Sequence, residues 1–161
     1  EDRHNVGKTY LDNRIAMMLA GRAAEEIVFN EITSGAGDDL KKATETARRM
    51  VCQWGMSEKI GLAVFKKGEI HPFLGRELTQ EKDYSEATAE LIDHEVRSIL
   101  QEGWKKASHI LKEHRDELER LAEELIRKET LSSREIADLL DLPHPEPNTE
   151  SENSRDQTAS P

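Results

Sequence analysis

Apolar side chains recur every three or four residues along three long stretches of the chain, the spacing typical of amphipathic helices. These stretches cover about residues 8–29, 39–54 and 85–111. Gly55 follows the second stretch directly and suits the left-handed conformation in which many helices end. The pattern therefore predicts three helices, each burying one face.

Two shorter helices are predicted after the third stretch. Asp116 is a suitable start for a helix that carries leucines at helical spacing. Ser132 and Glu135 have the three-residue separation of a capping box, in which each side chain bonds the other residue's backbone N–H. The last apolar residue of the final helix is Leu142, so we expect the folded part to cover residues 1–142.

The segment between the second and third helices predicts a small β-hairpin. Residues 61–65 are apolar, Lys66-Lys67-Gly68 is a turn signal, and residues 69–73 provide a returning strand. The expected fold class is therefore mainly α, with one small hairpin.

The helix predicted over residues 8–29 is unusually thin on one side. Small residues occupy several of its positions: Ala16, Ala20, Gly21, Ala23 and Ala24. A glycine inside a helix costs about 1 kcal/mol relative to alanine. We therefore expect a neighbouring element to pack closely on this side.

The last part of the chain, residues 143–161, differs in composition from the rest. It holds four of the five prolines and has almost no side chain able to enter a core. Such a segment cannot offset the entropy of ordering by burial, so we expect a disordered acidic tail.

Charge and composition exclude several classes of function. The net charge of −10 argues against direct binding to nucleic acid or an anionic membrane surface, since both require clustered Lys and Arg. No stretch has the roughly eighteen apolar residues of a transmembrane helix. Cys52 is the single cysteine, which rules out an internal disulfide and a cysteine zinc site; we expect it to be a buried, inert thiol.

No complete catalytic or nucleotide site is visible. A helical zinc peptidase motif needs histidines four residues apart, but the position four after His94 is Ser98, and His109 and His114 are five apart. We expect these histidines at the surface; His4, His71 and His144 are isolated. The glycine turn at residues 35–37 leads into two aspartates, which would repel phosphate.

The most informative acidic residues are Asp38 and Asp39, at the predicted start of the second helix. Aspartate there is usually a cap for free backbone amides, and its charge suits the helix dipole. The alternative is a metal ligand. Glu25, three residues after Arg22, has the spacing of an ordinary helical ion pair.

A series of short motifs follows one order along the chain. They are GRAAEEIVF from Gly21, TSGAGDDLKKAT from Thr33, ARRMVCQWGMSEKIG from Ala47, FLGRE at 73–77, YSEATAELIDHEV at 84–96 and KETL at 128–131. Together they resemble the C-terminal portion of the peptidase (M41-type) domain of the FtsH-type ATP-dependent zinc metalloproteases. The resemblance covers about residues 1–140 and implies a helical peptidase-domain fragment.

The resemblance implies roles for two carboxylates. Asp39 matches the aspartate that joins two histidines as the third zinc ligand, and Glu25 matches a glutamate near the metal, in a supporting role. Two positions depart from the family pattern: Asp38 stands where Asn is common, and Ala20 stands where Gly is common. The roles of helix cap and metal ligand are compatible for Asp39, since a carboxylate at the start of a helix can bond the free backbone amides and also bind a metal.

The remaining family features lie before Glu1 in the proteins that the chain resembles. They are the His-Glu-x-x-His helix, the ATPase module that binds ATP, and the membrane-spanning segment. Because the chain starts with Glu rather than Met, we expect truncation or processing, and a piece that is inactive alone. The resemblance further implies a homo-hexamer, anchored in a bacterial membrane with this domain on the cytoplasmic side, that degrades unfolded and membrane proteins.

An alternative function follows from the incomplete site. The chain could be a non-catalytic helical module that serves interaction or oligomerisation and leaves chemistry to other subunits.

Overall fold

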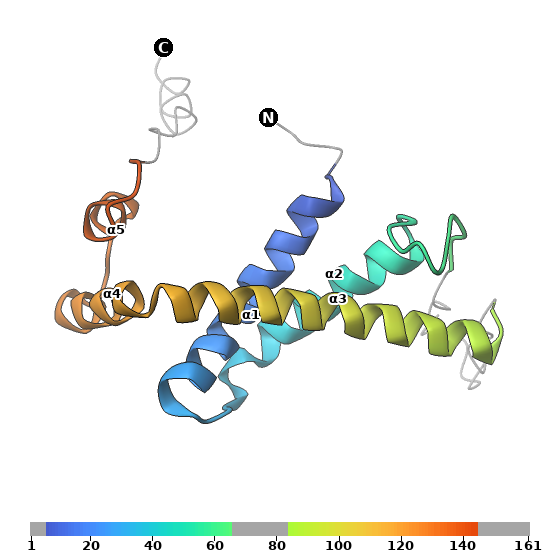
Figure 1. Cartoon of the computed structure of the whole chain (residues 1–161), viewed down its shortest axis with the longest axis horizontal. Coiled ribbons are helices and arrows are strands. Elements are labelled where there is room, and N and C mark those ends of the chain that lie inside the picture. The colour runs from blue at the N-terminus through green and yellow to red at the C-terminus, as the bar shows by residue number, and fades with distance from the viewer. Residues whose placement is uncertain (1–5, 66–83, 145–161) are drawn as a thin grey trace, which may run out of the picture. The chain divides into compact units, whose positions relative to one another are not determined.

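A computed structural model describes residues 6–65 and 84–144, which are mainly helical, as predicted (Figure 1). The chain divides into two compact units between Glu113 and His114. The first contains α1 (Lys8–Phe29), the 3₁₀ turn η1 (Ser34–Ala36), α2 (Gly37–Cys52) and α3 (Glu86–Glu113). The second contains α4 (Arg115–Lys128) and α5 (Ser133–Leu139).

The core of the first unit lies where α1, α2 and α3 pack against one another. Its largest fully buried side chains come from all three helices: Ile15, Met50, Val51 and Ile92. Figure 1 shows α3 running across α1. The apolar stripes predicted from the sequence therefore meet in one core.

The helices α1 and α3 approach each other closely at Gly103. A Cβ atom at this position would lie 2.8 Å from Ile15 Cγ2 and 3.5 Å from the backbone N of Ala16. The small residues Ala16 and Ala23 of α1 are buried, as expected of a thin side. Gly21 differs, because apart from the adjacent residues and backbone of its own helix nothing lies within 4 Å of a Cβ placed there.

The predicted end of the second helix was two residues too late. The helix ends at Cys52, and Gly55 has the predicted left-handed conformation, with φ of +59°. Trp54 therefore follows the helix, and 46% of its surface is exposed. Helical spacing alone placed this side chain on the buried face.

The predicted β-hairpin is wrong for the part that the structure describes. Residues 61–65 form no strand, while residues 69–73 lie outside the described residues. The alternating Leu62 and Val64 are 95% and 59% exposed, so they are not one face of a buried sheet. The Phe65 N–H instead donates to the Cys52 carbonyl at 2.9 Å, and its ring meets Tyr84 edge-on.

The loop after α2 is held to α3 through Glu95. This carboxylate accepts hydrogen bonds from Ser57 Oγ and Lys59 Nζ, both at 2.8 Å. Ser57 is buried, and its Oγ also accepts the Ile60 N–H. The hydrogen bond from Lys59 is the main reason that the pKa of Glu95 is lowered, against the opposing effect of burial; Ser57 and His94 add to the lowering.

The described part of the second unit contains two short helices. The capping box predicted at Ser132 and Glu135 is confirmed, because both reciprocal hydrogen bonds are present. Within α4 no residue is buried, and Ala137 is the buried residue of α5. Residues 145–161 lie outside the described residues, so the disordered tail stays a prediction. In the described ranges, every helix is too short or too polar to cross a bilayer.

Candidate functional site

The two aspartates lie in the first turn of α2, but they do not cap it. The N-cap position is Ala36, and no side chain makes a capping hydrogen bond there. Capping by Asp38 or Asp39 was therefore a wrong prediction, because the helix begins at Gly37, before both residues. Their charges still face the positive end of the helix dipole, which favours each by about 0.3–1 kcal/mol.

The Asp39 carboxylate is accessible and weakly engaged. Its side chain is 54% exposed, and Oδ1 lies 3.7 Å from Lys42 Nζ, an ion pair within one helical turn. Exposed ion pairs of this kind contribute little to stability. The carboxylate oxygens are therefore free to bind a cation, without the loss of a buried hydrogen bond.

Glu25 near the end of α1 connects to the turn that precedes α2. Thr33 Oγ1 donates to both carboxylate oxygens of Glu25 at 3.0 Å, and the Gly35 N–H donates to Thr33 Oγ1 at 3.1 Å. A Cβ at Gly35 would lie 3.3 Å from Thr33 Oγ1 and 3.5 Å from Glu25 Oε1. Glu25 thus fixes the 3₁₀ turn that leads into the helix carrying Asp39.

The hydrogen bond between Glu25 and Thr33 replaces the ion pair that the sequence spacing suggested. Within the described part of the chain, Arg22 makes no ion pair with Glu25. Thr33 was not singled out from the sequence, although its side chain caps η1. The sequence Thr33-Ser34-Gly35 carried a signal for this role, since a threonine hydroxyl commonly accepts a hydrogen bond from the backbone N–H of the residue two positions later.

The other candidate ligands are not brought together. Among residues 6–65 and 84–144, no group of three or more His, Cys, Asp or Glu side chains could hold a metal ion. The predicted surface positions of His94, His109 and His114 are confirmed, with side chains 66%, 71% and 62% exposed. Burial of Cys52 is likewise confirmed, and desolvation raises the pKa of its thiol.

Comparison with known proteins identifies the family. The family model of Peptidase family M41 matches residues 1–139. The chain belongs to peptidase family M41. This confirms the resemblance seen in the ordered motifs, and it places Glu25 and Asp39 inside the M41 segment.

Three M41 relatives carry names that describe the whole proteins. The chain is 53% identical over 136 residues to "ATP-dependent zinc metalloprotease FtsH" of Nitrosococcus oceani, covering 84% of the chain and 21% of the relative. It is 49% identical over 152 residues to FtsH 3 of Symbiobacterium thermophilum, covering 91% and 24%. It is 48% identical over 143 residues to FtsH 4 of Sphaerobacter thermophilus, covering 89% and 22%. The chain thus spans less than a quarter of the length of these relatives.

Proposed function

We propose that this M41 chain is part of an ATP-dependent zinc metalloendopeptidase, in which Asp39 is the third zinc ligand. The observation that carries the proposal is the match of residues 1–139 to the family, with Asp39 in the segment whose aspartate the resemblance assigns to the metal. The names of the relatives support zinc and ATP dependence for the intact protein.

The Asp39 carboxylate could fill one ligand position of a zinc ion. A carboxylate oxygen is a normal donor to zinc, and this one is exposed and held only by a 3.7 Å ion pair. The described residues do not supply a set of three donors. In the family that the chain resembles, the two histidines and the catalytic glutamate belong to a His-Glu-x-x-His helix that precedes the segment matching this chain.

Glu25 would act as a positioning residue for Asp39. Its carboxylate holds Thr33, Thr33 holds the backbone of Gly35, and Gly37 begins α2 two residues later. This chain of hydrogen bonds sets where the first turn of α2 begins. It supports Asp39 without requiring that Glu25 touch the metal, which agrees with the supporting role assigned from the family.

The site would serve hydrolysis of peptide bonds in protein substrates. When bound, zinc lowers the pKa of a coordinated water and polarises the scissile carbonyl. Asp39 would hold its ligand position, with its charge favoured by the α2 dipole. Unfolded and membrane proteins as substrates, a homo-hexameric assembly and a membrane anchor outside the chain belong to the same proposal, with this domain on the cytoplasmic side.

The ligand assignment is tested by Asp39→Ala in a version of the protein extended to include the His-Glu-x-x-His helix. We expect zinc affinity, measured by calorimetry, to fall by more than the roughly 10–100-fold that loss of a supporting partner costs. Peptidase activity on an unfolded protein should be lost in parallel. Unchanged zinc affinity would refute the assignment.

Asp38→Ala is the matched control, because it removes the same group one residue earlier in the same helical turn. We expect it to retain zinc and activity. Glu25→Ala should have an intermediate effect, weaker than Asp39→Ala and stronger than Asp38→Ala. We expect its zinc affinity to fall about 10–100-fold, the range for groups that support a ligand. A loss equal to that of Asp39→Ala would instead assign direct ligation to Glu25.

A further inference from the structure

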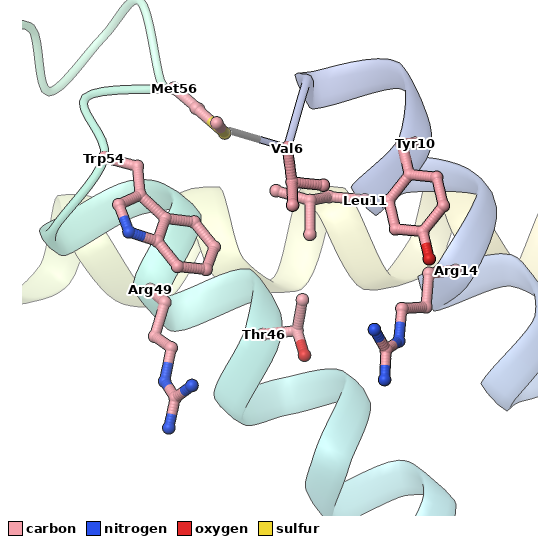
Figure 2. Close-up of a pocket in the computed structure, with 8 residues that line it drawn as sticks. All are labelled: Val6, Tyr10, Leu11, Arg14, Thr46, Arg49, Trp54 and Met56. Carbon is pink, nitrogen blue, oxygen red and sulfur yellow. The ribbon is translucent and has the colours of Figure 1, made fainter. Parts of the chain in front are cut away.

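The first unit has a second feature that the peptidase chemistry does not use, a pocket between the start of α1 and the end of α2. Its volume is about 510 Å³, within the range of small-ligand sites. Figure 2 shows the residues that line it: Val6, Tyr10, Leu11, Arg14, Thr46, Arg49, Trp54 and Met56.

The charge of the pocket is opposite to that of the chain. Arg14 and Arg49 line it, and none of its described lining residues is Asp or Glu, although the chain has a net charge of −10. Neither guanidinium has a hydrogen-bond or ion-pair partner among the residues that the structure describes. Thr46 is already used, since its hydroxyl donates to the Lys42 carbonyl at 2.8 Å. The two arginines are therefore the strongest unused donors of the pocket.

Polar and apolar groups occupy different sides of the pocket. In Figure 2 the guanidinium groups of Arg14 and Arg49 stand on opposite flanks of Thr46 and extend away from Val6, Leu11 and Met56, which lie on the other side. The rings of Trp54 and Tyr10 stand on opposite flanks. Trp54 and Tyr10 are about half exposed, at 46% and 51%, so they present apolar surface that the described residues leave uncovered.

We propose that this pocket binds the C-terminal carboxylate of a peptide whose last residue is apolar. The two guanidinium groups would bind the carboxylate, because charge-assisted hydrogen bonds from arginine suit that planar anion. The apolar side chain would lie between Trp54 and Tyr10, against Leu11. The inference does not depend on zinc or on Asp39.

The composition of the pocket favours this ligand over a phosphorylated one. Nucleic acids and polyphosphates are bound by clusters of basic residues, and the acidic chain offers two arginines here and no lysine among the lining residues. A phosphate group would also leave the aromatic and aliphatic side of the pocket unfilled. A single negative charge attached to an apolar side chain uses both sides.

The test is a titration of the full chain with acetyl-Gly-Gly-Phe, followed by the indole N–H resonance of Trp54 in NMR spectra. We expect this free acid to bind at least about tenfold more tightly than the same peptide with a C-terminal amide, as for loss of a charge-assisted bond. Acetyl-Gly-Gly-Ser, which keeps the carboxylate but lacks the apolar side chain, should also bind more weakly.

Arg14→Gln and Arg49→Gln should each weaken binding of the acid about tenfold and leave binding of the amide unchanged. The matched control is Arg97→Gln, which removes one exposed positive charge from α3 without changing the pocket. Circular dichroism verifies that each variant remains helical. Equal affinity for acid and amide, an equal loss in Arg97→Gln, or no saturable shift up to the solubility limit of the peptide would each overturn the proposal. Failure here would leave the assignment of Asp39 untouched.

Discussion

At the scale of single residues, stability depends on a few positions where two segments come very close. Gly103 allows α3 to touch Ile15 and Ala16 of α1, whereas Gly21 of α1 has open space where a side chain would start. The two glycines have the same intrinsic cost in a helix, so their different surroundings decide what a substitution does.

Replacing these glycines by alanine should therefore change stability in opposite directions. Gly103→Ala places a Cβ 2.8 Å from Ile15 Cγ2, a branched atom with little freedom to move, and we expect a loss of about 1–2 kcal/mol. Gly21→Ala should gain about 0.5–1 kcal/mol from helix propensity alone. Urea denaturation of both variants measures the difference. A stabilising Gly103→Ala would contradict the packing of α3 on α1.

Glu95 makes the attachment of the loop to α3 dependent on pH. Its pKa is lowered from the ordinary value of 4.5, mainly by the hydrogen bond from Lys59. A lowered pKa in the folded state means that the stabilisation is complete above pH 4.5 and is lost as pH falls through the folded pKa. Glu95→Gln should therefore cost about 1 kcal/mol at pH 7 and progressively less below pH 4.5.

The measurement is the free energy of unfolding of Glu95→Gln and of the unaltered chain between pH 3 and pH 7. Glu90→Gln is the control, since Glu90 is exposed on the same helix. A difference between Glu95→Gln and the unaltered chain that does not change with pH would show that the charge of Glu95 contributes nothing.

At the scale of elements, local signals predicted the helices better than the contacts between them. α1 has the predicted bounds, and α5 has the predicted cap, because periodicity and capping depend on neighbouring residues. The hairpin was wrong because residues 61–65 are apolar for another reason: Phe65 bonds the end of α2 and packs on Tyr84. The pairing of Ser57 with Glu95, 38 residues apart, has no local signature.

The helix α5 has only seven residues, so its cap should decide whether it forms. Ser132→Ala removes the acceptor for the Glu135 N–H and should destabilise α5 by about 0.5–2 kcal/mol. Amide hydrogen exchange at Ile136 and Leu140 would show this as faster exchange. Ser133→Ala, at the next position, should leave the rates unchanged; equal effects of both variants would show that the capping box is unimportant.

Acid should act on the same helix only at very low pH. Hydrogen bonds from Lys128 and from the Ser132 backbone lower the pKa of Glu135 to about 2. The bonds of the capping box to Glu135 should therefore persist at pH 4 and be lost as pH falls through about 2.

At the scale of the whole molecule, the two compact units differ in how much they bury. The first has a core built from α1, α2 and α3, whereas α4 has no buried residue. Local stability follows buried apolar contacts, so we expect amides of α4 to exchange much faster than those of α2 around Met50 and Val51. Hydrogen exchange of the whole chain measures both; equal protection would contradict this division.

The candidate site could be predicted only in part. The expectation that Asp39 is a metal ligand came from resemblance, because an aspartate at a helix start has the ordinary explanation of a cap. The structure removes that explanation, since the helix begins at Gly37 and no side chain caps it. Among the described residues no group of three or more His, Cys, Asp or Glu side chains could hold a metal ion, and no property of Asp39 alone identifies partners for it.

Because Cys52 is buried, its reaction with thiol reagents can report local opening of the structure at the end of α2. The thiol is 6% exposed at the end of α2, and desolvation raises its pKa above the ordinary value of 9.0. Thiol reagents attack the thiolate, so we expect them to react with Cys52 mainly when the end of α2 separates from its neighbours. Because the sequence has no other cysteine, the rate of labelling at neutral pH counts those separations directly, without any engineered probe.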